Sequence, residues 1–234
     1  MQERLYIVMP AYNEEVNIES VAREWHEIIA EIEEGKLVIV NDGSKDGTYA
    51  KLQELQKELP RLTALTKPNG GHGSATLFAY EYALAEGADY VFQTDSDGQT
   101  LPSEFWELWK NRLDYDIQIG YRKGRQDGLS RIVVTKMLKL ALFLNFGLWI
   151  KDANTPFRLM SAVSLAGFLP RVPKNHSLAN VLLTVLYEKN GMRRRYVSIT
   201  FRQRRGGVNS INIPRIIKIG LKAVKDFAYL RKSL

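Results

Sequence analysis

The chain has 234 residues, of which 45% are hydrophobic and 25% charged, a balance that indicates a globular protein and excludes a disordered one. It contains no cysteine, which excludes a disulfide framework and a thiolate metal site and fits a reducing compartment. The net charge is +7 and basic residues concentrate after Lys189, which indicates an anionic partner: phosphates, nucleic acid or a membrane surface.

Short apolar runs alternate with helical patterns over residues 1–122. Strands are expected at 5–10, 36–42, 61–67, 90–95 and 115–121. Helices are expected at 21–32, 48–59, 74–87 (ended by Gly87) and 103–113. Because the strand runs are continuously apolar, they should be buried on both faces, as in a parallel sheet. We therefore predict an α/β fold with a doubly wound, mostly parallel sheet flanked by helices.

The pattern changes after Tyr121, where an apolar helical region begins. Its uncharged part, Leu140–Ile150, is too short to span a bilayer, which needs about 20 apolar residues. Flanking lysines allow this segment to lie along a membrane interface, but a core helix explains it equally well. The remaining expected elements are a helix at 178–191, a basic strand at 193–204 and a basic amphipathic helix at 211–234, which could bind an anionic membrane or dock on the domain.

Polar and glycine-rich loops follow four of the predicted strands. They read PAYNEE (10–15), NDGSKDGT (41–48), KPNGGHGSA (67–75) and TDSDGQ (94–99). Ligands of such sheets bind beyond the carboxyl ends of the strands, so these loops predict a nucleotide site. Asp95 and Asp97 would repel each other, and a hard divalent cation relieves such repulsion through oxygen ligands. An isolated Asp-x-Asp is most often a solvated loop, so its interpretation depends on the other three loops.

Taken in this order, the four loops resemble those of the family 2 inverting glycosyltransferases with the GT-A fold, a Rossmann-like architecture. Within that family the chain is most similar to the polyprenyl-phosphate glycosyltransferases, such as dolichol-phosphate mannose synthase. The resemblance implies a GT-A domain at 1–210 and a basic amphipathic C-terminal helix at 211–234. Within the domain, residues 1–122 would bind the nucleotide sugar and residues 123–210 would bind the acceptor. The acceptor-binding half would include an apolar interface helix at about 129–150.

The resemblance implies roles around the nucleotide. Pro10, Tyr12 and Glu14 would line the base and the ribose. Asp42 would accept a hydrogen bond from the base, although an Asp in front of Gly43 is also a common way to form a turn.

Other residues would surround the diphosphate and the donor sugar. Gly71 and Gly73 would let the backbone approach the nucleotide at a helix start suited to anions. Asp95 and Ser96 would lie near the ribose and the donor sugar. The implied ligands of a Mg²⁺ or Mn²⁺ cofactor are Asp97 and Gln99.

The implied reaction is an in-line displacement at the anomeric carbon, in which the metal and Arg204 neutralise the departing diphosphate. Hydroxyl acceptors need a base, which other family 2 enzymes supply in a Glu-Asp or Thr-Glu-Asp motif, and none occurs between Lys174 and Gly191. A phosphate acceptor is already anionic, so this absence favours a polyprenyl phosphate. The predicted catalytic residues are Asp152, Asp95 and Arg204, where Asp152 steers the acceptor or acts as base. The residues predicted to grip the acceptor phosphate are Arg122, Arg131 and Arg158.

We therefore expect metal-dependent transfer of a sugar from a nucleotide-diphosphate sugar, UDP-linked rather than GDP-linked, to undecaprenyl or dolichyl phosphate. The enzyme would bind peripherally to the cytoplasmic face of a membrane, without nucleic acid, and could act with a separate membrane protein or as a homo-oligomer. The alternatives are a family 2 enzyme that glycosylates a saccharide hydroxyl in cell-wall or polysaccharide synthesis, a nucleotidyltransferase or sugar-nucleotide hydrolase, and a non-enzymatic basic binding module.

Five further aromatic or histidine residues are not chosen for the site. His26 lies on a helix of mixed face, His72 falls at a position that varies in the family, and His176 lies near a helix start. Trp106 and Trp109 are assigned to helix packing rather than to sugar stacking.

Overall fold

Seven strands form one sheet in the order β3-β2-β1-β4-β6-β5-β7. The computed structural model describes residues 2–122, 129–174, 176–203, 227 and 231, apart from the side chains of 129–134. The strands are β1 Leu5–Ala11, β2 Gly35–Asn41, β3 Leu62–Thr66, β4 Tyr90–Gln93, β5 Ile117–Arg122, β6 Arg158–Ser161 and β7 Arg194–Ile199. β6 runs antiparallel to β4 and β5, whereas the other pairs are parallel. The predicted α/β fold with a mostly parallel sheet is confirmed.

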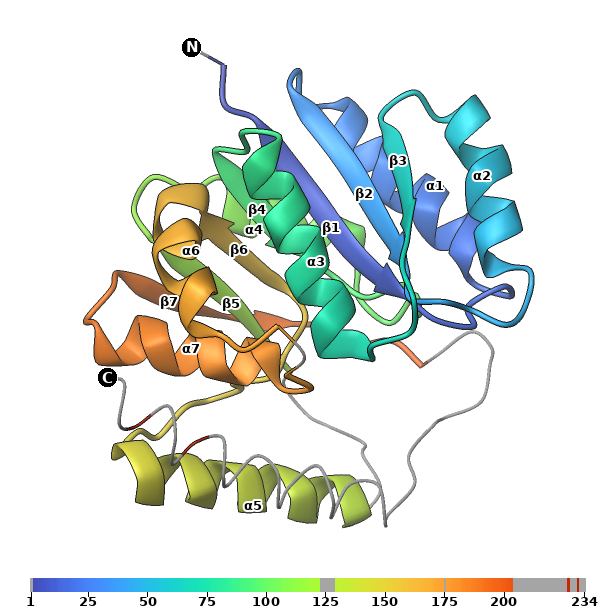
Figure 1. Ribbon diagram of the computed structural model, residues 1–234. Coiled ribbons are helices and arrows are strands. Elements are labelled where there is room, and N and C mark those ends of the chain that lie inside the picture. Colours follow the sequence, from blue (N-terminus) through green and yellow to red (C-terminus); the bar gives the residue numbers. More distant parts are fainter. Residues whose placement is uncertain (1, 123–128, 175, 204–226, 228–230, 232–234) are drawn as a thin grey trace.

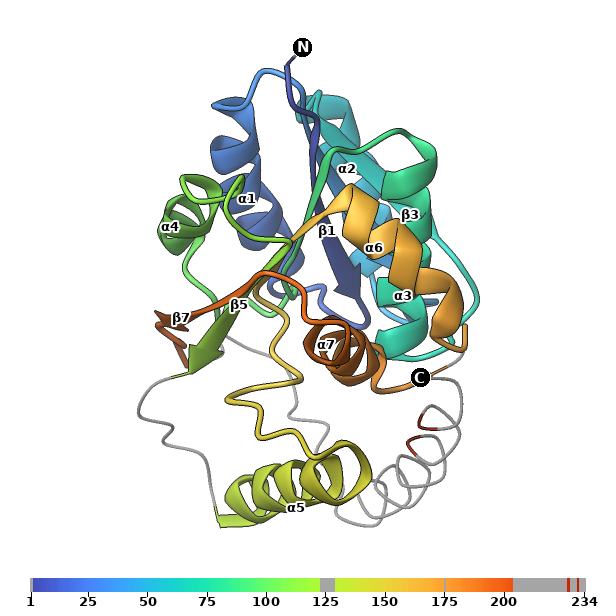
Figure 2. The ribbon, with the colours of Figure 1, turned by 90° about the vertical axis from the view of Figure 1, so that its left-hand side faces the viewer.

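Helices cover both faces of this sheet and make three layers (Figures 1 and 2). The helices are α1 Ile18–Ala30, α2 Thr48–Glu58, α3 His72–Ala85, α4 Phe105–Trp109, α5 Leu129–Phe146, α6 Ala162–Phe168 and α7 Ala179–Lys189, with 3₁₀ turns η1 Pro102–Glu104 and η2 Leu169–Arg171. One core cluster joins the sheet to α1, α2 and α4, and a second joins it to α3, α6 and α7. β1 lies inside the sheet, between β2 and β4, and all seven of its residues are buried, as its continuous apolar run predicts.

The first three helices begin and end close to their predicted positions. In α1, Val21, Trp25 and Ile28 are buried at the helical spacing, and the Trp25 ring lies 5.3 Å from that of Phe92 in β4. Gly87 directly follows the last turn of α3 with φ of +78°, the left-handed conformation that glycine adopts without strain.

Two elements of the second half were not predicted. β6 has four residues and begins with a charged residue, and α6 follows it without a loop, so no long apolar run or turn signal marks either. The fourth predicted helix is also shorter than expected, because the 3₁₀ turn η1 replaces its start and a turn follows Trp109. The division into donor and acceptor halves stays a prediction, since β6 and β7 complete the sheet begun by the first half.

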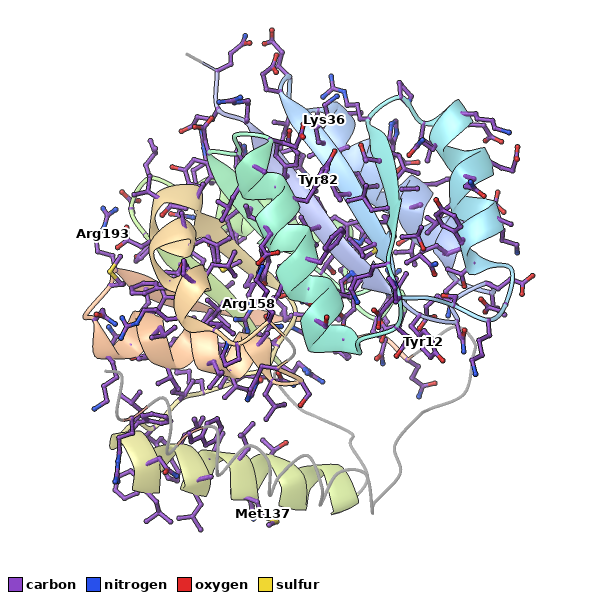
Figure 3. The ribbon with its side chains drawn as sticks, viewed as in Figure 1. Tyr12, Lys36, Tyr82, Met137, Arg158 and Arg193 are labelled. Carbon is purple, nitrogen blue, oxygen red and sulfur yellow. The ribbon has the colours of Figure 1, made fainter. Side chains whose placement is uncertain are left out.

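α5 lies apart from the layers, on the side toward which the arrowheads of β1, β2 and β3 point (Figure 1). Leu142 and Phe146 are buried, and the Phe146 ring lies 5.6 Å from that of Phe227. The opposite side carries exposed apolar side chains, which we call the apolar face of α5: Met137, Leu140, Phe143 and Leu144. Met137 points away from the rest of the protein (Figure 3). The helix is therefore packed along one side and exposed along the other.

None of the helices in the described ranges combines the length and the apolar character needed to cross a membrane. The helix predicted at 211–234 lies outside the described residues, apart from Phe227 and Arg231.

Candidate active site

Four loops meet at the carboxyl edge of the sheet, and hydrogen bonds tie them together. Asn13, after β1, is joined to the loop after β2: its backbone N–H donates to Ser44 Oγ (3.0 Å), and its Oδ1 accepts from the backbone N–H of Lys45 (2.8 Å). The hydroxyl of Ser96, after β4, donates to the carbonyl oxygen of Pro10 in β1 (2.8 Å). Loops that are distant in sequence are therefore held side by side.

Asp42 connects the loop after β2 to the glycine-rich loop before α3. Only 2% of Asp42 is exposed. Its Oδ1 accepts from Lys67 Nζ (2.7 Å) and the Gly70 N–H (3.0 Å), and its Oδ2 accepts from the Gly71 N–H (2.7 Å). The Asp42 carboxylate thus fixes the conformation of the glycine-rich loop through three hydrogen bonds. A direct bond from Asp42 to a base stays a prediction.

Two glycines at the start of α3 have different functions. Gly71 has φ of +85°, and a Cβ built there would meet no atom within 4 Å. Its backbone therefore faces open space and can approach a ligand. At Gly73 a Cβ would lie 2.0 Å from the carbonyl oxygen of His176. Gly73 therefore allows α3 to pack against the segment before α7, and its predicted place at the nucleotide stays a prediction.

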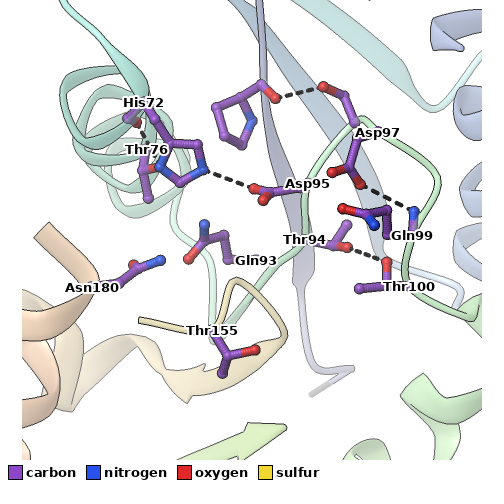
Figure 4. A network of polar contacts seen from close by, with 12 residues as sticks. His72, Thr76, Gln93, Thr94, Asp95, Asp97, Gln99, Thr100, Thr155 and Asn180 are labelled. Atoms are coloured by element: carbon purple, nitrogen blue, oxygen red, sulfur yellow. Dashed lines mark hydrogen bonds and ion pairs between the residues drawn. The ribbon is translucent and has the colours of Figure 1, made fainter. Parts of the chain in front are cut away.

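Asp95, after β4, forms an ion pair with His72, the first residue of α3, with 2.8 Å between Oδ1 and Nε2 (Figure 4). Burial alone would lower the pKa of His72, but attraction to Asp95, the hydrogen bond to it and attraction to Asp97 together raise that pKa above 6.5. His72 was set aside in the sequence, so this contact is a site feature that sequence reasoning missed.

The Asp-x-Asp loop is fixed by the segment that follows β7. Asp97 Oδ1 accepts from the backbone N–H of Gln99 (3.0 Å) (Figure 4). Gln99 exchanges two hydrogen bonds with Arg202: its carbonyl oxygen accepts from the Arg202 N–H (2.7 Å), and its Nε2 donates to the Arg202 carbonyl oxygen (3.1 Å). The Arg202 guanidinium in turn donates to the carbonyl oxygen of Thr100 (2.9 Å) and to Glu24 (3.0 Å).

The donor atoms of this loop supply part of the coordination of a divalent metal. Within the described part of the chain, no group of three or more His, Cys, Asp or Glu side chains is arranged to hold a metal. Asp97 and Gln99 offer hard oxygen atoms, and the Gln99 amide nitrogen is already used by Arg202. Mg²⁺ is typically bound by one or two carboxylates together with substrate phosphates and water. The residues therefore fit a metal whose coordination a diphosphate completes.

Arg122 and Asp152 lie next to each other at the end of β5, with 3.6 Å between Nε and Oδ2. The Arg122 guanidinium also lies 4.3 Å from the centre of the Phe201 ring. Phe201 forms an isolated β-bridge with Thr100, so the pair is close to the Asp-x-Asp loop. The structure thus brings together a predicted acceptor residue and the predicted base. Their roles stay predictions.

Arg158 is fully buried beneath the site (Figure 3). Its Nε and Nη2 donate to the carbonyl oxygen of Thr155 (3.0 and 2.7 Å), and Nη2 also donates to that of Ala153 (3.2 Å). Nη1 donates to the Asn180 carbonyl oxygen (3.0 Å) and to Thr184 Oγ1 (3.3 Å). Since all five N–H groups have protein acceptors, the prediction that Arg158 grips the acceptor phosphate is corrected: it ties β6 to α7.

Three further donor-site predictions differ in exposure. Tyr12 is 43% exposed at the carboxyl edge. Glu14 is buried and accepts a hydrogen bond from Asn17 Nδ2 (2.8 Å). Ser96 is also buried, and its hydroxyl is engaged with Pro10. The Ser96 side chain thus joins two loops, and its predicted place near the donor sugar stays a prediction.

Two predicted anion-binding residues cannot be placed. Arg204 and the side chain of Arg131 lie outside the described residues.

Comparisons with known proteins match most of the α/β region. The family model described as glycosyl transferase family 2 matches residues 6–164. UDP-N-acetylglucosamine–dolichyl-phosphate N-acetylglucosaminyltransferase of Methanococcus voltae is 26% identical over 69% of this chain and 70% of its own length. Polyprenol monophosphomannose synthase of Mycolicibacterium smegmatis is 26% identical over 90% of this chain and 82% of its own length. The match to undecaprenyl-phosphate 4-deoxy-4-formamido-L-arabinose transferase of Pseudomonas fluorescens, 29% identical over 65% of this chain, spans only 45% of that relative.

The fold also matches solved structures. One is glucosyl-3-phosphoglycerate synthase from Mycobacterium tuberculosis in complex with Mn²⁺ and UDP-glucose, with a TM-score of 0.70 and 18% identity over 98% of this chain and 79% of that one. At this identity the likeness demonstrates the shared GT-A fold alone.

Proposed function

Because this chain belongs to glycosyl transferase family 2, we propose that it moves a sugar from a nucleotide-diphosphate sugar to a polyprenyl phosphate. The donor is a UDP-sugar rather than a GDP-sugar, and the acceptor is undecaprenyl or dolichyl phosphate. Membership of the family makes the chain a glycosyltransferase and removes the nucleotidyltransferase, hydrolase and non-enzymatic alternatives. Relatives named for dolichyl, polyprenol and undecaprenyl phosphates support the acceptor class.

One observation carries the proposal: four loops, tied together by side chains, place the Asp-x-Asp loop beside the open start of α3. Asp95 reaches α3 through His72, and Ser96 anchors the same loop to β1. Gly71 presents bare backbone to open space at this helix start. Carboxylates, free backbone and a helix N-terminus suit a metal-bound diphosphate.

Each residue has a simple physical task in this proposal. Asp97 and Gln99 would hold Mg²⁺ or Mn²⁺, which when bound stabilises the negative charge that develops on the leaving diphosphate. Tyr12 and Glu14 would flank the nucleoside, and the Gly71 backbone would face the phosphates. Asp95 would orient the donor sugar.

The acceptor would enter between the Asp-x-Asp loop and α5. The Arg122 guanidinium offers a positive charge at this place, and Asp152 beside it either orients that charge or receives a proton. We keep residues 1–122 as the donor half and 123–210 as the acceptor half of the domain.

The apolar face of α5 supports peripheral binding to a membrane, which we take to occur on the cytoplasmic face. Leu140 and Leu144 are 53% and 69% exposed, and Trp149 just beyond the helix is 72% exposed. Lys136 and Lys139 add positive charge on the same helix. An amphipathic helix of this kind binds an interface by burying apolar area and by attraction to anionic lipids. The face lies on the same side of the protein as the carboxyl edge of the sheet (Figure 1).

A transfer assay tests the proposal. Radiolabelled UDP-glucose, UDP-N-acetylglucosamine and GDP-mannose are each incubated with the protein, Mn²⁺ and polyprenyl phosphate, followed by organic extraction. We expect label in the organic phase with a UDP-sugar, and none when unphosphorylated polyprenol replaces the acceptor. Label on an added saccharide would instead establish the saccharide-hydroxyl alternative. Thermal stabilisation by neither UDP nor GDP, with or without Mn²⁺, would overturn the donor assignment.

A further inference from the structure

The ion pair between His72 and Asp95 joins the start of α3 to the loop after β4 at the donor edge. The 2.8 Å contact links residues that are far apart in sequence (Figure 4). The His72 side chain is 50% exposed and that of Asp95 26% exposed, so both border the open side of the site.

Two contacts hold the backbone at His72. Thr76 Oγ1 donates to the His72 carbonyl oxygen (2.9 Å). Gly73 packs so closely on His176 that a Cβ would not fit, whereas Gly71 on the other flank faces open space. The imidazole therefore projects toward the open side of the site from a helix start whose backbone is fixed by these contacts.

The charge of His72 is unusual for its position. The positive end of the helix dipole disfavours a cation in the first turn of a helix. At the start of α3 the N-cap Gly71 has no side chain to cap the helix, and the Asp42 carboxylate accepts the N–H of Gly71. Asp95, which faces the imidazole, and Asp97 near by raise the pKa of His72 and so favour its protonated form. The ion pair therefore favours a positive charge on His72, next to the Asp-x-Asp loop.

Asp95 depends on this partner. Within the described residues, the Asp95 side chain has an ion pair and a hydrogen bond with His72 and no other cation in reach. Asp97, in contrast, also accepts a backbone N–H from its own loop. An anionic diphosphate that enters beside two carboxylates is repelled by both, and a cation paired with one of them reduces that repulsion.

We propose that His72 is a positioning residue of the donor site, which holds the Asp95 carboxylate in place and offsets its charge when a nucleoside diphosphate binds. This inference rests on the proposed function, since it takes the donor edge to be a nucleoside-diphosphate site. It assigns a role to a residue that the sequence pattern treats as variable.

The test compares three variants with the wild type by calorimetric binding of UDP in the presence of Mn²⁺. His72→Leu removes both the hydrogen bond and the charge, whereas His72→Gln keeps an N–H at the place of Nε2 but not the charge. The matched control is His26→Leu, the same change on α1. We expect UDP affinity to fall roughly tenfold to a hundredfold in His72→Leu, because hydrogen bonds to charged groups have about this effect. The UDP affinity of His72→Gln should lie between those of His72→Leu and the wild type, and His26→Leu should bind UDP as the wild type does.

Steady-state kinetics separate positioning from simple loss of structure. In His72→Leu the KM for the donor should rise more than kcat falls, while the midpoint of thermal unfolding stays within the range of the control. A second arm adds Asp95→Asn: on that background His72→Leu should weaken UDP binding little further. Full additivity of the two changes, or UDP binding by His72→Leu equal to that of the wild type, would overturn the proposal. A wild type that binds no nucleoside diphosphate instead sinks the proposed function itself, and this inference with it.

Discussion

The loops after β1, β2 and β4 are tied to one another by side chains, whereas α5 packs on the described chain through one apolar side and leaves the other bare. Asp42 alone holds three groups of the glycine-rich loop. On α5, Leu142 is buried while Leu144, two residues later, is mostly exposed. The donor edge is thus preorganised by polar contacts, and the helix beside it is shaped as if for a second apolar surface.

This difference indicates where precision is needed. A metal-bound diphosphate requires fixed oxygen atoms, because misplaced groups stabilise the leaving group poorly. A lipid surface requires only apolar area and charge, which tolerate movement. Substitutions in the donor loops should therefore impair catalysis and nucleotide binding, whereas those on the apolar face of α5 should impair membrane binding.

The largest effect is expected from Asp97→Asn. The variant keeps the Oδ1 that accepts the Gln99 N–H, so the loop should stay folded while losing the charge that a divalent ion needs. We expect transfer to fall on the order of a thousandfold, together with loss of the Mn²⁺-dependent stabilisation by UDP. The control is Asp114→Asn, an exposed acid far from the donor loops. Undiminished transfer by Asp97→Asn would contradict the metal role.

Arg158→Met should destabilise the fold rather than weaken substrate binding. It removes five N–H donors from buried oxygens that have no access to water. We expect the free energy of unfolding in urea to fall by about 3 kcal/mol. Arg4→Met, on a half-exposed side chain, should change it little. If Arg158→Met is instead as stable as the wild type and only the KM for the acceptor rises, Arg158 binds the acceptor and does not serve mainly to link β6 to α7.

A double variant, Leu140→Glu with Leu144→Glu, tests the apolar face of α5. Each change removes an apolar side chain worth about 1.5 kcal/mol or more when fully buried, so partitioning onto vesicles containing anionic phospholipid should fall at least about tenfold. Val163→Glu is the control, because Val163 is 88% exposed on α6. UDP binding should be unaffected in both variants. Equal vesicle binding by the double variant and the control would show that this face does not meet the membrane.

Much of the first half could be predicted because its signals are local. The continuous apolar runs gave the parallel strands, and strand-end loops gave the position of the site. The features that could not be predicted depend on contacts with distant residues. Gly73 is small because of His176, and Arg158 is buried by partners on α7, neither of which a motif records.

The His72–Asp95 pair shows the same limit from the other direction. Each residue sits in a predicted loop, but only the crossing of α3 over the end of β4 brings them together. Likewise β6 escaped prediction because four residues inserted antiparallel between β4 and β5 have no pattern of their own.

The smallest effect is expected at the opposite edge of the sheet, where Asp116 pairs with Arg193 (2.9 Å). The hydrogen bonds from Arg193 lower the pKa of Asp116 below 3.8 against the opposing effect of burial. A lowered pKa in the folded state stabilises the protein above the unfolded value, and this stabilisation disappears as the pH falls through the folded value. Asp116→Asn should therefore be slightly less stable than the wild type at pH 7, and the difference in unfolding free energy should shrink below about pH 4. UDP affinity should not change, because this pair lies at the start of β5 and not at its carboxyl end; a loss of UDP binding would show that the two edges of the sheet are coupled and that the donor loops are less self-contained than their hydrogen bonds indicate.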